Sequence, residues 1–166
     1  VEGNPFKDSV LDFKIFVEKG ASGFTVPKWN GSKVSKPAPE IEVFNPDIPL
    51  SSYYISAYYK SGLSLLNFKD VLIAQKSTWK TLLLRNVGSR DLANLKLSIV
   101  GGASRDFIVR PLPKTILKSG EMVALKLCFK PLSRGIKKCE LRITSNDTDE
   151  NPFVVSLKGA GLGLIE

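Results

Sequence analysis

From about residue 62 onward, short apolar runs alternate with turn residues, and no stretch shows the i, i+3, i+4 apolar spacing of a helix. Within several runs apolar and polar residues alternate. Val123, Leu125, Leu127 and Phe129 share one face of residues 122–130, as in a strand with one buried and one wet face. The ranges expected to form strands in this region are 63–68, 79–85, 92–100, 107–109, 115–117, 122–130, 136–144 and 153–157.

Short strands joined by Gly, Pro and Asn turns predict an all-β, immunoglobulin-like sandwich of two sheets with about seven to nine strands. Glycines at 101–102 and 159–161 are interpreted as a turn and a strand exit.

The first part of the chain is less regular, with strand candidates only at 40–44 and 52–59. Residues 32–39, "SKVSKPAP", have the composition of a linker. We therefore divide the chain into an N-terminal extension, residues 1–36, and the sandwich, residues 37–166. We expect the extension to pack on the sandwich as a cap; the alternative is that it is a remnant of a preceding domain.

The absence of histidine removes the commonest general base and the commonest zinc ligand from this chain. No nucleophile elbow or pair of carboxylates placed by strand parity is evident, so we expect no catalytic residues, no cofactor and no enzymatic activity. The formal net charge is +8, but the basic residues are spread along the strands rather than interleaved with aromatics. Nucleic acid is therefore not an expected partner. No apolar run approaches the ~18 residues of a transmembrane helix, so membrane insertion is not expected.

The two cysteines, Cys128 and Cys139, fall on neighbouring expected strands. Strand parity places Cys139 inward and Cys128 outward between two inward residues, so a disulfide between them is not expected. We predict two free thiols, with Cys128 at the surface.

The stretch "ITSNDTDENP", residues 143–152, contains the one candidate metal site, Asp147, Asp149 and Glu150. Carboxylates are suitable calcium ligands, but the spacing lacks the alternation and the central glycine of an EF-hand loop. The alternative, which we favour, is a structural corner in which Asn146 and Asp147 fold back on their own backbone as Asx turns.

Two sets of apolar residues are candidate contact surfaces. Strand parity turns Trp79 and Leu83 outward, and an exposed Trp–Leu patch would mark an interface unless the extension covers it. The tyrosines of residues 52–59 are interpreted as a half-buried strand at the sandwich edge; the alternative is a carbohydrate platform. These tyrosines are Tyr53, Tyr54, Tyr58 and Tyr59.

Several stretches of the chain carry a family resemblance in their order. "LNFKDVLIAQKSTWKTLLLRNVGSRDL", with its Asn86-x-Gly88 turn, is followed by "DFIV" and then by "ILKSGEMVALKLCFKPLSRGIKKCELRITSNDTDENPFVVSLKGAG". With "PEIEVFN" as a lead-in strand, this region resembles the choice-of-anchor D type of bacterial immunoglobulin-like module. It is similar, more distantly, to the hydin-type and major-sperm-protein-like domains of ciliary and centrosomal proteins.

The resemblance implies a non-catalytic structural or adhesion module of a larger, modular, secreted or cell-surface protein, whose partners are proteins or neighbouring domains. The chain opens Val1-Glu2-Gly3 without a signal peptide, which we interpret as a mature or excised chain. One alternative is a cytoplasmic scaffold module of the hydin type in a cilium or centrosome, which two free thiols would suit. Another is a carbohydrate-binding module that uses the tyrosine strand.

Overall fold

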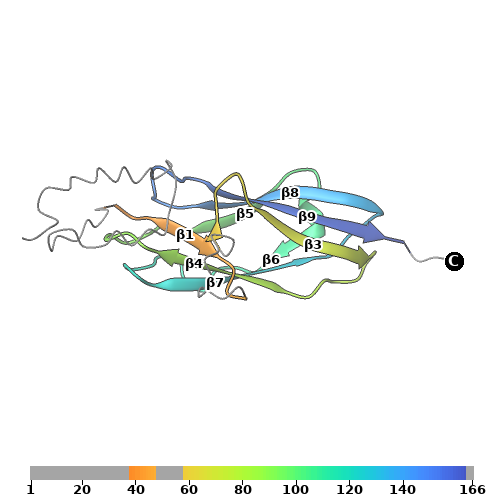
Figure 1. Cartoon of the computed structure of the whole chain (residues 1–166), viewed down its shortest axis with the longest axis horizontal. Helices are drawn as coiled ribbons and strands as arrows, with labels where there is room; N and C mark the ends of the chain where they lie inside the picture. The colour runs from red at the N-terminus through yellow and green to blue at the C-terminus, as the bar shows by residue number, and fades with distance from the viewer. Residues whose placement is uncertain (1–37, 48–57, 164–166) are drawn as a thin grey trace, which may run out of the picture.

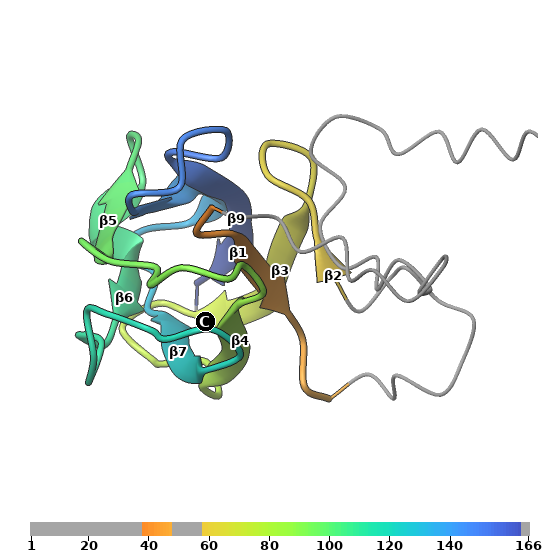
Figure 2. The same cartoon turned by 90° about the vertical axis from the view of Figure 1, so that its left-hand side faces the viewer.

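The computed structural model describes residues 38–47 and 58–163, and these form a two-layer, all-β sandwich (Figures 1 and 2). In the described residues there are nine strands, and the only helical element is a 3₁₀ turn, η2 (Ser104–Asp106). The strands are β1 (Ile41–Phe44), β2 (Tyr58–Tyr59), β3 (Leu65–Leu72), β4 (Lys80–Asn86), β5 (Lys96–Val100), β6 (Phe107–Val109), β7 (Met122–Phe129), β8 (Gly135–Thr144) and β9 (Phe153–Leu162). The predicted fold class and strand number are confirmed.

One layer is an antiparallel five-stranded sheet in the order β2-β1-β4-β7-β6. The other layer has four strands in the order β3-β9-β8-β5. Here β3 runs parallel to β9, while β9, β8 and β5 pair antiparallel. Because β3 and β9 are parallel, both end at the same end of the sandwich (Figure 1).

The core lies between the two sheets and follows the period of two in the sequence. The four apolar residues of 122–130 that share one face are all buried, and Cys139, Leu141 and Ile143 line the facing side from β8. Three rings meet at one end of this core: Phe107 lies 4.8 Å from Phe129 and 5.5 Å from Phe68, between ring centroids.

Some strand boundaries differ from those predicted. Only Lys96–Val100 of the range 92–100 is in a ladder, because Asn94 has a left-handed backbone (φ 59°) that interrupts the strand. Leu92 instead forms an isolated bridge with Leu117, which is all that remains of the expected strand at 115–117.

The interpretation of residues 159–161 as a strand exit is wrong, because β9 continues to Leu162. The glycines are needed inside the strand for close packing. A β-carbon on Gly159 would lie 2.5 Å from the Phe129 ring, and one on Gly161 would clash with the Ser133 carbonyl oxygen.

Both cysteines are free, as predicted, and Cys139 lies in the core. The prediction of a surface thiol at Cys128 is wrong, since its exposed fraction is 0%. Ile108 of β6 lies opposite Cys128 on one side. On the other side the chain at Thr78 and Trp79 passes beside Cys128. It is held there because the Ser77 N–H donates to the Phe129 carbonyl oxygen and Lys80 pairs with Leu127 in the ladder. Parity gave the direction of the Cys128 side chain but not the neighbours that cover it.

The N-terminal extension, residues 1–36, and its expected packing as a cap lie outside the described residues. Within the described part of the chain, no helix has the length and apolar character needed to cross a membrane.

Candidate functional site

The acidic corner joins the β8–β9 loop to the start of β1. Asp147 is fully buried, and one of its carboxylate oxygens accepts a hydrogen bond from the backbone N–H of Ile41 at 2.9 Å. Its other carboxylate oxygen accepts a hydrogen bond from the N–H of Asp149 at 3.3 Å, and this bond closes an Asx turn at Asp147. The Asn146 side chain instead bonds away from its own backbone, to Ala93 and Asp91.

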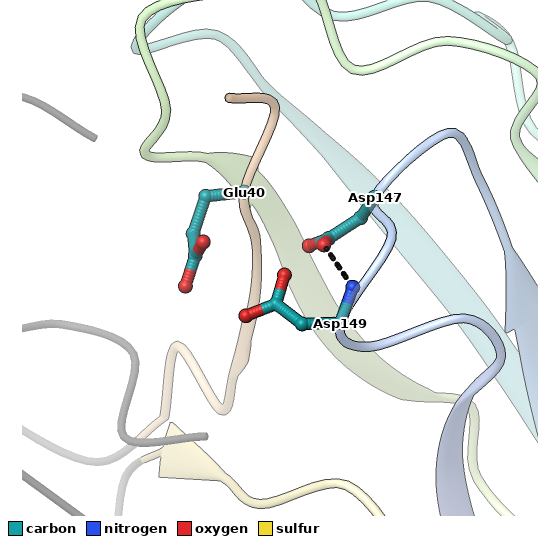
Figure 3. A group of neighbouring side chains, drawn as sticks. All are labelled: Glu40, Asp147 and Asp149. Atoms are coloured by element: carbon teal, nitrogen blue, oxygen red, sulfur yellow. Dashed lines mark hydrogen bonds between the residues drawn. The ribbon is translucent and has the colours of Figure 1, made fainter. Parts of the chain in front are cut away.

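The structure adds Glu40 to this corner (Figure 3). Glu40 immediately precedes β1, and its carboxylate lies with those of Asp147 and Asp149 so that one oxygen from each falls within 4.8 Å of the others. Sequence reasoning grouped Glu150 with the two aspartates instead, because it is adjacent in sequence. No local signal pointed to Glu40, which reaches the corner only through the pairing of β1.

The electrostatics of the corner explain how Asp147 is held. Burial raises the pKa of the Asp147 carboxyl, and the neighbouring Asp149 carboxylate raises it further. The backbone N–H groups of Ile41 and Asp149 oppose this shift. Both carboxylate oxygens of Asp147 thus accept hydrogen bonds from backbone N–H groups. The bond from Ile41 ties the β8–β9 loop to β1, and we call this arrangement the clamp. The calcium site stays the less favoured alternative to a structural corner; in it Glu40 and Asp149 would supply the other carboxylate oxygens for the ion.

The outer face of the five-stranded sheet presents the predicted Trp79. Trp79 directly precedes β4 and is 38% exposed. The guanidinium of Arg110, just beyond β6, lies over the Trp79 ring at 4.4 Å from its centroid. An arginine stacked on an indole in this way is a cation–π pair. Arg110 was not among the predicted residues, because its strand is not adjacent to β4 in the sheet.

Leu83 also faces outward, as its buried neighbours Leu82 and Leu84 require. It lies two residues beyond Thr81, opposite Phe44 on β1 and Ala124 on β7. Trp79 and Leu83 therefore share a face, and Thr81, opposite Lys126, lies between them.

Next to the Phe44–Leu83 pair, the buried Glu42 of β1 pairs with Arg85 of β4 across the ladder. The Arg85 Nε donates to one Glu42 carboxylate oxygen at 2.8 Å, and the other oxygen, Oε1, is buried and has no hydrogen-bond partner among the described residues. Burial raises the pKa of Glu42, and the Arg85 charge only partly offsets this.

Of the four predicted tyrosines, Tyr53 and Tyr54 lie outside the described residues. Tyr58 and Tyr59 form the edge strand β2 and are half-buried. Tyr59 packs against the core, and the Tyr58 ring lies 5.7 Å from that of Phe44 between centroids.

The described residues thus form an immunoglobulin-like sandwich with an acidic clamp at one corner and an aromatic–arginine pair on one outer face. Residues 63–160, more than half of the chain, match the model of the family described as "HYDIN/CFA65/VesB-like, Ig-like domain". The chain belongs to this family.

Solved structures with the same fold come from distant proteins. A PapD-like domain (domain 7) of human CEP192 has a TM-score of 0.54 at 15% identity, with 86% of this chain and 99% of that domain covered. A protein of unknown function from Porphyromonas gingivalis W83 has a TM-score of 0.52 at 14% identity, with 74% of this chain covered. A family 123 glycoside hydrolase from Clostridium perfringens has a TM-score of 0.51 at 11% identity, with 77% of this chain covered.

The match spans 46% of the Porphyromonas protein and 28% of the hydrolase. No curated protein sequence matches the chain. At these identities the likeness shows the fold alone.

Proposed function

We propose that this chain is a non-catalytic protein-interaction module, of structural or adhesion type, in a larger modular protein that is secreted or displayed at the cell surface. We place it in the choice-of-anchor D type within its family. The observation that carries the proposal is the half-exposed Trp79 ring stacked under Arg110 on the outer face of the five-stranded sheet.

Tryptophan and arginine are the residues most often found at the energetic centre of protein interfaces. A partner that covers the Trp79–Arg110 stack removes a large apolar ring from water. It does so with little loss of side-chain freedom, since the two groups already restrain each other. The same fold occupying 46% of a longer bacterial chain supports a modular context. The lack of histidine supports a non-catalytic role.

The test is site-specific photo-crosslinking in the full-length protein in its own cells. A photoreactive phenylalanine analogue replaces Trp79, and a matched control places it at Leu132, which is 57% exposed on the β7–β8 loop. We expect a discrete crosslink, to a partner or a neighbouring domain, from position 79 alone. Equal crosslinking from both positions, or none from either, would count against an interface at Trp79.

A cytoplasmic scaffold module of a cilium or centrosome is the second candidate. It is favoured by the two free, buried cysteines, which need no oxidising compartment. Labelling of intact cells with a membrane-impermeant biotin reagent separates the two candidates, because only an extracellular module exposes its lysines to that reagent. Carbohydrate binding is the third candidate, and titration with oligosaccharides against tyrosine fluorescence tests it.

We further propose that residues 1–36 form an extension that packs on the sandwich of residues 37–166. Limited proteolysis with mass mapping tests this, since a packed extension resists cleavage at residues 32–39. Rapid cleavage there, with release of a stable core, would instead identify a linker or a remnant of a preceding domain.

A further inference from the structure

The outer face of the four-stranded sheet, on the opposite side of the sandwich from Trp79, carries a shallow groove of about 640 Å³. Its floor is formed by β8 and β9, and it extends to the beginning of β3 and the end of β5. None of its lining residues belongs to the acidic corner or to the Trp79 face.

The floor of the groove contains two lysines that face each other. Lys138 of β8 and Lys158 of β9 are directly opposite in the antiparallel ladder. Side chains in this relation have β-carbons about 4.5–5.5 Å apart, and like charges there destabilise the sheet. Within the described residues, neither ammonium group has an ion pair or a hydrogen bond. The fold alone gives no reason for this juxtaposition.

Glu140, the one acidic residue among the described lining residues, does not neutralise the two lysines. The Glu140 carboxylate is engaged by Arg142, whose guanidinium nitrogens donate to it at 2.9 and 3.1 Å. The groove therefore keeps a net positive charge. This charge favours a negatively charged ligand at the two lysines.

The sides of the groove are apolar. Leu63 and Leu65 on one side are 81% and 51% exposed, and Val100 on the other side is 39% exposed. The register aligns Leu65, Ser156, Glu140 and Val100 in one row across all four strands. The lysine pair occupies the next row, so apolar side chains flank a positive centre.

We propose that this groove binds a segment of another protein in which carboxylates are flanked by bulky apolar side chains. The carboxylates would lie between Lys138 and Lys158, and the apolar side chains would cover Leu63 and Leu65 on one side and Val100 on the other. Nucleic acid fits less well. No described residue that lines the groove is an aromatic suited to base stacking, and its leucines would stay exposed beside a phosphate backbone. This proposal does not depend on the Trp79 interface.

The charge reversal Lys138→Glu provides a readout that a purely structural role would not give. Opposite Lys158 it replaces a like-charge pair by an opposite-charge pair, so the melting temperature should rise. The same change should weaken binding of an acidic segment by at least about tenfold. Stability and binding would then change in opposite directions, which shows that the lysine pair is retained for a ligand.

The binding probe is an array of short synthetic peptides with two central Asp or Glu residues flanked by Leu, Ile, Val, Phe or Met. A matched array carries Asn or Gln at the central positions. The whole chain is compared with Lys138→Glu/Lys158→Glu and with a control of equal charge change, Lys118→Glu/Lys126→Glu. The control lysines are exposed and lie away from the groove. Single-stranded oligonucleotide is tested in parallel.

We expect binding to acidic peptides over their neutral counterparts, lost in the groove variant and kept in the control. Equal loss in both variants would show that net charge alone acts, and would overturn the proposal. So would a lack of preference for the acidic array, or binding of oligonucleotide alone through the same lysines. Trp79→Ala should leave peptide binding unchanged, so failure here and failure of the Trp79 interface are distinguished.

Discussion

The ring of Phe129 on β7 occupies the space that a side chain on Gly159 of β9 would need. An ideal β-carbon built on Gly159 lies 2.5–2.8 Å from three carbons of that ring. The two residues come from different sheets, so this contact sets how closely the layers approach at the end of the core where Phe107 and Phe68 also meet.

Gly159→Ala should therefore destabilise the fold. The added methyl group forces the Phe129 ring or the β9 backbone to move, and overpacking of this kind costs about 1–3 kcal/mol. Urea unfolding followed by far-ultraviolet circular dichroism measures the change. Gly102→Ala is the matched control, since nothing lies within 4 Å of a β-carbon there. Equal stability of the two variants would mean that the sheets are less tightly packed than described.

The clamp at the acidic corner predicts different roles for two neighbouring aspartates. Asp147→Ala leaves the N–H of Ile41 without its acceptor, and a buried unsatisfied donor costs about 1–3 kcal/mol. Asp149→Asn keeps both bonds to Asp147 and should change the free energy of unfolding little. Thermal melts of the wild type and both variants in calcium and in EDTA provide the measurement. A calcium-dependent rise in melting temperature that Asp149→Asn abolishes would establish the alternative, a calcium site.

The two thiols should be inert in the folded chain. Burial raises the pKa of the Cys128 thiol and raises that of Cys139 to about 12, so neither forms a thiolate at about pH 8. A disulfide reagent should modify neither residue until urea is added, after which both react. Lys126→Cys, on an exposed position of the same strand as Cys128, is the positive control and should react at once. Rapid native reaction of Cys128 would show that the segment with Trp79 opens readily.

Glu42 should make the fold less stable as the pH rises. Its folded pKa lies above the reference value of 4.5, so between these two values the folded state holds more protons than the unfolded state. The stability linked to this proton is present below pH 4.5 and is lost as the pH rises through the folded pKa. Glu42→Gln removes the titration, so the stability of this variant relative to the wild type should increase with pH across that window.

Glu121 provides a control, because its pKa is shifted in the direction opposite to that of Glu42. The Lys118 N–H and the Lys114 side chain hold the pKa of Glu121 below 4.5. Its contribution is present above 4.5 and is lost as the pH falls through the lower folded pKa. Urea unfolding over a series of pH values should therefore give Glu42→Gln and Glu121→Gln opposite trends relative to the wild type. Parallel trends would refute the assignment of the Glu42 shift to burial.

Features that repeat with a period of two could be predicted from the sequence, because burial of one face acts on every second residue. The alternation in residues 122–130 and 136–144 thus predicted β7, β8 and the side chains that these strands bury in the core. The Asn86-x-Gly88 turn was also evident, and the structure gives its physical reason. The buried Asn86 amide donates to the carbonyls of Arg90 and Leu117 and accepts from the N–H of Gly88.

Contacts that depend on which strands become neighbours could not be predicted. Asp147 reaches Ile41 across 106 residues of sequence, and Arg110 reaches Trp79 from a strand on the far side of β7. The Lys138–Lys158 pair depends on the register of β8 and β9. The alternating pattern does not determine this register, because a shift by any even number of residues keeps the same side chains on the core face. The burial of Cys128 likewise depends on neighbours from other strands.

The parallel pairing of β3 with β9 also determines how the sandwich responds to tension. Pulling on the beginning of β3 and the end of β9 draws the two strands past each other, because they run in the same direction (Figure 1). The hydrogen bonds that join β3, Leu65–Leu72, to β9 then bear the force together, in shear, instead of breaking one after another.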